Sequence, residues 1–321
     1  MLGLVSLDDE KRGLFGLEAL IYRQRLKRNR LEKIFLTIDM AKQDILEEAV
    51  SGLEKKYLPR HIYAIIADPR SGDILALAQR PTFNPGRRGS TDPYSTRNLV
   101  LENNFWPGPM SRPLATYAEP PPGAEGHAYG TESSHGAREF HDRLMHLGAG
   151  QSCGILLRPE SVYRLPFLED CNGISIKKCE EGYGFKMTAA QLVRGYCALS
   201  DGHLRKLRLF DSIKIHDDSE TRKLPVPDSG IAALDEEARR HSMTTFNRKT
   251  TASGMEYLLK SASWNLHDPY SERWLEATAC ILPAVESETV VLLIMEADPH
   301  QEDEVMPTET AAEDAIRQIS K

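Results

Sequence analysis

The sequence predicts an α+β fold, in which the two ends of the chain form one antiparallel sheet and a helical lobe is inserted between them. Segments with the composition and alternation of strands lie at Tyr63–Ala78 and Trp274–Met295. Between them, Arg138–Asp201 reads as helices joined by loops. Because the strands do not alternate with crossover helices, the pattern excludes a doubly wound parallel sheet.

The first predicted elements are a helix and a hairpin. Asp39 opens the helix, since apolar residues follow it at helical spacing and two lysines occupy the last turn, where cations suit the helix dipole. In the hairpin, Tyr63–Ala67 and Ile74–Ala78 are the strands, and Asp68–Asp73 has the residues of a turn.

The later elements have equally clear boundaries. Thr188 caps a helix that Gly202 ends. Trp274–Leu282 and Thr289–Met295 are predicted strands joined by a short polar turn. The last residues, TAAEDAIRQISK, form a helix or a tail.

Composition narrows the class of protein. The chain has 321 residues, is 40% hydrophobic and 27% charged, and carries a formal net charge of −7, which argues against a nucleic-acid partner. It has neither a long apolar run nor a signal-peptide pattern at its start. The basic segment 21–33 is interpreted as a solvated linker or helix face; the alternative is a juxtamembrane segment whose anchor lies outside this chain.

We expect no cofactor and no metal. The five cysteines are widely spaced, as in proteins with free, buried thiols. His127, His135, His141 and His146 are separated by 8, 6 and 5 residues, which matches no usual zinc signature.

Four separated segments resemble the transpeptidase domain of class B penicillin-binding proteins. These are GLFGLE, LTIDMAKQDILEEAV with the hairpin YAIIADPRSGDILALAQRPTFNP, GYGFKMTAAQLVRGYCALSDG, and ATACILPAVESETVVLLIMEADP. The resemblance implies the fold that these proteins share with serine β-lactamases. It also implies three regions: 1–35, a linker or remnant of an N-terminal pedestal; 36–305, a transpeptidase-like domain with a trimmed helical lobe at about 105–245; and 306–321, a helix or tail.

The resemblance implies a lost catalytic centre. The family uses a serine and a lysine in S-x-x-K at the start of a helix. At the same spacing this chain has Pro109 and Arg112. Proline has no hydroxyl group, and arginine stays protonated at physiological pH, so we expect no catalytic residues here. Proline is compatible with a first helical turn, and Pro120–Pro122 is expected to end that helix early.

The family's other two motifs, S-x-N and K-T-G, are also weak in this sequence. Ser133 and His135 are interpreted as a relic of the first. Lys249-Thr250 resembles the second without its glycine, but TTASGMEYLLKSA reads as a helix, and we find no K-T-G between it and Trp274. Neither Ser111 nor Ser175-Ile176-Lys177-Lys178 makes a convincing replacement for S-x-x-K.

Three hypotheses about function follow from the resemblance. The first is an inactive homologue that acts as a scaffold or regulator of peptidoglycan synthesis and cell division, with other proteins of that machinery as partners. The second is an active D,D-transpeptidase or carboxypeptidase with a relocated nucleophile. The third is a non-catalytic binder of the peptidoglycan stem peptide, in which Arg112 pairs with the terminal carboxylate. Trp106 is a candidate surface anchor for a partner. By resemblance, the protein works outside the cytoplasmic membrane.

Overall fold

The core of the molecule is a six-stranded antiparallel sheet. The computed structural model describes residues 12–14, 16–27, 31–85, 92–115, 141–157, 159–165, 181–215, 221–223, 230–265, 274–297 and 306–320. The strand order is β3-β2-β11-β10-β9-β8, from β2 (His61–Ala67), β3 (Ile74–Arg80), β8 (Asn247–Thr250), β9 (Glu256–Asn265), β10 (Trp274–Leu282) and β11 (Thr289–Ala297). The predicted hairpin and the two predicted C-terminal strands are confirmed.

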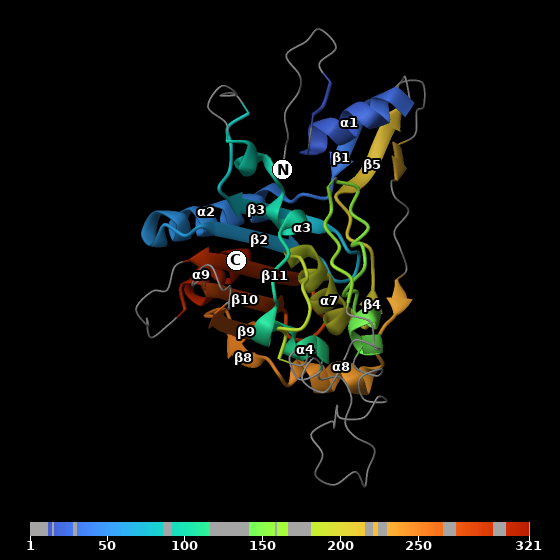
Figure 1. The fold of residues 1–321 in the computed structure, drawn as a ribbon. Coiled ribbons are helices and arrows are strands. Elements are labelled where there is room, and N and C mark those ends of the chain that lie inside the picture. Colours follow the sequence, from blue (N-terminus) through green and yellow to red (C-terminus); the bar gives the residue numbers. More distant parts are fainter. Residues whose placement is uncertain are drawn as a thin grey trace, which may run out of the picture.

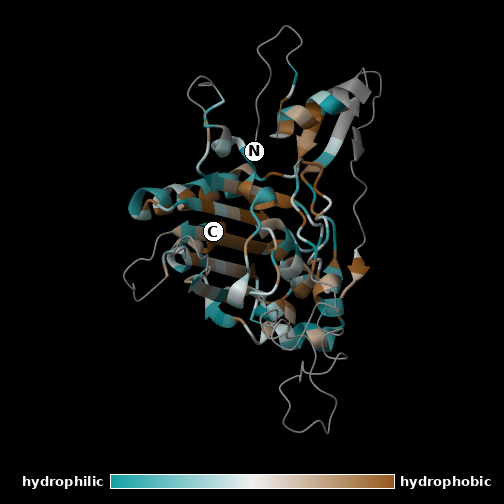
Figure 2. Ribbon diagram, viewed as in Figure 1, coloured by the Kyte–Doolittle hydropathy of each residue, from teal (hydrophilic) through white to brown (hydrophobic). Residues whose placement is uncertain are grey.

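An early strand, β2, and a late strand, β11, are neighbours near the centre of this sheet. β2 pairs with β11 in the register Ile65↔Leu292, and every residue of both strands is buried. Figure 2 shows these central strands coloured mostly as hydrophobic. Strands buried on both faces need apolar residues at consecutive positions, which HIYAIIA and TVVLLIMEA largely supply.

Helices cover both faces of the sheet (Figure 1). One face packs against α2 (Met40–Tyr57) and α9 (Pro307–Ile319) through residues such as Leu46 and Ile316. The other face carries the lobe, with α3 (Leu99–Glu102), α4 (Arg112–Ala115) and α7 (Ala189–Asp201). The Asp39 side chain accepts the backbone N–H groups of Ala41 and Lys42, as predicted for the start of α2.

α7 is the main helix of the lobe. Thr188 and Gln191 form a capping box at its start, and Gly202 ends it with φ +85°. Gly195 lets another helix approach closely, because a Cβ atom there would lie 2.9 Å from the Leu114 side chain of α4. The predicted limits of this helix are therefore confirmed, and α7 supports the segment that carries Pro109.

The middle of the chain also contributes strands. β5 (Phe210–Ile215) pairs with β1 (Leu31–Leu36) and β6 (Thr221–Lys223) in a separate three-stranded sheet of order β1-β5-β6. α1 (Gly16–Lys27) lies beside it in Figure 1. The remaining elements are the two-stranded sheet of β4 (His203–Leu204) and β7 (Ile231–Ala232), helix α8 (Glu236–Met243), and the 3₁₀ turns η2 (Pro93–Thr96) and η3 (Gly108–Ser111). The division of the chain near residue 35 stays a prediction.

The predicted helix over TTASGMEYLLKSA is wrong. These residues are the turn and second strand of the β8–β9 hairpin, in which Thr250 pairs with Glu256. Gly254 adopts φ +88° in that turn, a conformation that glycine reaches without strain. The Ser253-Gly254 dipeptide is the sequence signal for the turn. Because β9 is partly buried on both faces, apolar residues lie on both sides of Lys260 in the sequence. Their spacing resembles that of a helix.

Candidate functional site

Pro109 lies in a short helical turn at the start of α4. The turn is η3, and proline occupies an early position where its missing N–H group is not needed. The Tyr196 hydroxyl of α7 donates to the Met110 carbonyl oxygen at 2.6 Å, and both side chains are buried. Pro109 thus lies at the start of a helix, where the sequence analysis expected it, and its ring carries no reactive group.

The neighbouring hydroxyl group does not replace the missing nucleophile. Ser111 is 1% exposed, and its Oγ donates to the Gly108 carbonyl oxygen at 2.8 Å. A buried hydroxyl that satisfies its own turn is not accessible to a substrate. The structure thus agrees with the sequence-based rejection of Ser111.

Gly182 and Trp264 pack against the turn that contains Gly108. Gly182 packs so closely that a Cβ atom there would lie 2.1 Å from the Gly108 carbonyl oxygen, and its own carbonyl accepts the Gly108 N–H at 3.0 Å. A Cβ on Gly108 would lie 2.9 Å from the indole of Trp264. The Trp264 Nε1–H donates to the Trp106 carbonyl oxygen at 3.0 Å. The large indole of β9 therefore packs directly against the residue before Pro109.

Lys260 is a site residue that the sequence reasoning missed. Leu258 and Trp264 of β9 pack in the core of the lobe face, while Tyr257 and Leu259 pack in the core of the α9 face. Since side chains alternate along a strand, Lys260 points to the lobe face. It lies beyond the end of β8, whose pairing with β9 stops at Asn247↔Leu259. Among the described residues, Lys260 therefore has a strand partner only in β10.

The electrostatics place Lys260 close to Arg112. Burial lowers the pKa of Lys260, and the positive charge of Arg112 lowers it further. Arg112 itself is exposed. The charges of Arg112 and Lys260 thus act on each other near the η3 turn.

The residues Lys260-Ser261-Ala262 match K-T-G with a hydroxyl residue second and alanine third. They lie on β9, next to β10, within the segment TTASGMEYLLKSA that the sequence analysis interpreted as a helix. The alanine differs from glycine in carrying a Cβ on the lobe face, where it packs against the core. The sequence analysis overlooked this resemblance because it interpreted the segment as a helix.

Lys249, the other lysine considered, faces away from the site. Its Nζ lies 2.8 Å from Glu309 and 2.7 Å from Glu313 of α9, on the opposite face of the sheet. The sequence-based rejection of Lys249-Thr250 as the third motif agrees with this geometry.

Trp106, the candidate surface anchor, is partly buried against the lobe core. The Lys186 ammonium lies 4.1 Å from the centre of its ring, within the range of a cation–π contact. Its role as an anchor stays a prediction. Ser133, His135 and Pro120–Pro122 lie outside the described residues. In the described part of the chain, no group of three His, Cys, Asp or Glu side chains could hold a metal, and no helix is long and apolar enough to cross a membrane.

The fold of the described residues is that of the transpeptidase domains of penicillin-binding proteins. The chain matches penicillin-binding protein 3 of Mycobacterium tuberculosis, solved in complex with aztreonam, with a TM-score of 0.77 and 17% identity over 100% of this chain and 87% of that one. The chain also matches a peptidoglycan synthetase from Bifidobacterium adolescentis, with a TM-score of 0.71 and 19% sequence identity. This match covers 89% of this chain and 60% of that one. No family model matches the chain.

Sequence relatives are class B penicillin-binding proteins. The "Probable peptidoglycan D,D-transpeptidase PbpC" of Pseudomonas aeruginosa is 25% identical over 220 residues, which cover 56% of this chain and 39% of that protein. "Stage V sporulation protein D" of Bacillus subtilis is 36% identical over 74 residues, or 23% of this chain and 12% of that protein. The chain thus spans at most about two fifths of these relatives.

Proposed function

We propose that this chain is a catalytically inactive transpeptidase-like domain that serves as a scaffold or regulatory component of peptidoglycan synthesis and cell division. The observation that carries the proposal is Pro109, which the sequence resemblance aligns with the family's nucleophile and which lies at the start of a helical turn. Arg112 at the base position and the locked hydroxyl of Ser111 support it, because neither can supply the missing chemistry. The relatives' names place them in peptidoglycan synthesis and sporulation, and we infer an extracytoplasmic location from them.

Covalent labelling tests this proposal. The full chain is incubated with a fluorescent penicillin and its intact mass is measured. We expect no adduct, because acylation needs a nucleophile with a base in reach. The same protein after heat denaturation controls for non-specific labelling. A single acylated serine in the native protein, wherever it lies, would establish the relocated active enzyme instead.

A second candidate function is a binder of the peptidoglycan stem peptide. It is favoured by the proximity of Arg112 and Lys260, since two cations can hold one terminal carboxylate. Calorimetry with a peptide ending in D-alanyl-D-alanine, and with its C-terminal amide as control, tests this function. We expect the free acid alone to bind, and Lys260→Met to weaken binding by about tenfold, as for one charged hydrogen bond. Equal binding of acid and amide would remove this candidate.

A further inference from the structure

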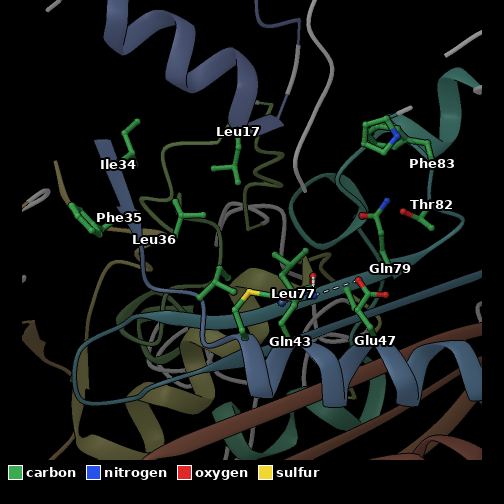
Figure 3. A pocket seen from close by; sticks show the side chains of 14 residues that line it. Leu17, Ile34, Phe35, Leu36, Gln43, Glu47, Leu77, Gln79, Thr82 and Phe83 are labelled. Atoms are coloured by element: carbon green, nitrogen blue, oxygen red, sulfur yellow. Dashed lines mark hydrogen bonds between the residues drawn. The ribbon is translucent and has the colours of Figure 1, made fainter. Parts of the chain in front are cut away.

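A cavity of about 540 Å³ lies between α1 and β1 on one side and the start of α2 and β3 on the other (Figure 3). Leu17 of α1 and Leu77 of β3 point into it from opposite walls, and Ile34 and Leu36 of β1 line it as well. Its volume is in the usual range for small-molecule pockets. None of the described residues that line it belongs to η3, α4 or β9, so the cavity is separate from the site around Pro109.

β1 supplies a broad part of the apolar wall. Three consecutive residues, Ile34, Phe35 and Leu36, line the cavity, although side chains normally alternate between the two faces of a strand. The pairing of β1 with β5 shifts between Phe35 and Leu36, and such a bulge interrupts the alternation. Residues that a regular strand would divide between two faces therefore contribute to one cavity.

The polar side chains of the wall are already bonded. The Gln43 amide accepts the N–H of Leu77 at 2.9 Å and donates to its carbonyl oxygen at 3.0 Å. Gln79 bonds two backbone groups of the segment that follows β3. The carboxylate of Glu47 pairs with Arg80 at 3.0 Å. A polar ligand would find few free partners in this wall, so the interior suits a hydrocarbon group.

The mouth of the cavity combines apolar side chains with a cation. Met40 and Phe35 line the cavity and are nevertheless 66% and 43% exposed. Exposed apolar groups of this size are typical of ligand-binding grooves, and the flexible thioether of Met40 adapts to different shapes. Lys33 lies on the same face of β1 as Phe35, about 7 Å away along the strand, and is exposed. In the part of the chain that the structure describes, Lys33 has no anionic partner.

A hydrocarbon interior with a cation outside its mouth matches one class of ligand, a single alkyl chain that ends in an anionic head group. The chain gains free energy by leaving water, while the head group stays hydrated and meets an opposite charge. We propose that this cavity binds a long-chain fatty acid, with the alkyl chain between the α1–β1 and α2–β3 walls and the carboxylate at the mouth, near Lys33.

Chain length tests the binding of the alkyl group. Saturated fatty acids of increasing length, each below its critical micelle concentration, compete with a fluorescent fatty acid for the full chain. Burial of each CH₂ group should strengthen binding about fourfold, until the alkyl chain fills the cavity and the affinity levels off. Affinity that does not depend on chain length, or that rises without levelling off, would show non-specific adsorption and overturn the proposal.

Point variants at exposed positions test the place of the ligand without disturbing the core. Lys33→Met should weaken binding of the acid by about tenfold, as for one charged hydrogen bond, and leave binding of the matching fatty alcohol unchanged. Met40→Glu should weaken binding of the acid several-fold, because it places a like charge at the mouth. Leu58→Glu, at a residue 82% exposed at the end of α2, is the matched control and should bind as wild type.

The melting temperature of each variant establishes that it is folded. Equal affinity of wild type and Met40→Glu would overturn the cavity as the binding site. Equal losses for acid and alcohol in Lys33→Met would overturn the position of the carboxylate. A fatty acid that binds only to a dimer would assign the cavity to an interface between two copies and overturn binding within one chain.

Discussion

The two lysines of the β8–β9 hairpin stand on opposite faces of the sheet and in opposite electrostatic settings. Lys249 faces α9; burial alone would lower its pKa, but hydrogen bonds with Glu309 and Glu313 raise it. Lys260 faces the lobe, where burial and the charge of Arg112 lower its pKa. The α9 face thus satisfies its cation with a structural ion pair, while the lobe face brings two cations together beside Pro109. The lowered pKa of Lys260 is therefore the electrostatic feature that distinguishes the lobe face from the α9 face.

We expect the largest loss of stability from a substitution on the lobe face of the sheet. Gly182→Ala places a Cβ 2.1 Å from a backbone oxygen at φ +80°, and nothing in the turn can move away cheaply. We expect the free energy of unfolding to fall by about 3 kcal/mol or more, from overpacking and backbone strain together. Urea unfolding measures it.

Gly254→Ala is the matched control for that variant, because it has φ +88° but nothing within 4 Å of the new Cβ. It should lose only about 1 kcal/mol, from the backbone conformation alone. Equal losses in the two variants would show that Gly182 does not clamp the Pro109 turn.

Lys249→Met tests the α9 side. It leaves Glu309, a side chain 17% exposed, without its cation, and we expect a loss of about 1–2 kcal/mol at pH 7, less than for a fully buried pair. Burial opposes the shift, but hydrogen bonds with Lys249 and Ser261 hold the pKa of Glu309 below its usual 4.5. A carboxylate whose pKa is lower in the folded than in the unfolded chain stabilises the fold at pH values above its unfolded-state pKa. This contribution is lost as the pH falls through the folded-state pKa.

The difference in stability between wild type and Lys249→Met should therefore shrink as the pH falls below about 4.5. Thermal unfolding at several pH values measures it. A difference that is constant from pH 7 to pH 3 would mean that the ion pair does not stabilise α9.

Lys260→Met should have a smaller effect of opposite sign. Removing one of two facing cations relieves repulsion, so we expect the melting temperature to stay the same or rise slightly. A depressed lysine pKa means that Lys260 binds fewer protons in the folded than in the unfolded chain, so its own contribution to stability should rise with pH up to about 10.5, and the stability difference between wild type and Lys260→Met should change accordingly. A clearly lower melting temperature in Lys260→Met would show that Lys260 has an anionic partner in the fold.

The smallest effect is expected from repair of the first motif. Pro109→Ser with Arg112→Lys restores the nucleophile and base at the family's spacing, and both positions accept these residues. We still expect penicillin acylation to be absent or very slow, because Trp264 and Gly182 hold the turn in its present position, and misplacement by about 1 Å can cost about 10²-fold. Intact-mass measurement over time follows the reaction. Rapid stoichiometric acylation would show that only two residues separate this site from an active one.

Much of the fold could be predicted because its signals are local. Asp39, Thr188 and Gly202 cap helices through contacts within a few residues, and each lies where the sequence placed it. β9 could not be predicted in this way. Its apolar residues serve two cores on opposite faces, so they lack the simple alternation of a half-buried strand. The error over β9 also concealed Lys260.

By itself, the sequence predicted that Pro109 and Arg112 replace the nucleophile and base of the family that it resembles, because residue identity and spacing are local properties. Only the tertiary structure decided which lysine faces that turn. Lys249 and Lys260 lie on the same hairpin, and their sequence neighbourhoods both resemble K-T-G. Lys260 points to the lobe because side chains alternate along β9. Lys249 forms an ion pair with Glu309 of α9, a helix more than 45 residues further along the chain. Such long-range packing decides a side chain's environment, which no local pattern encodes.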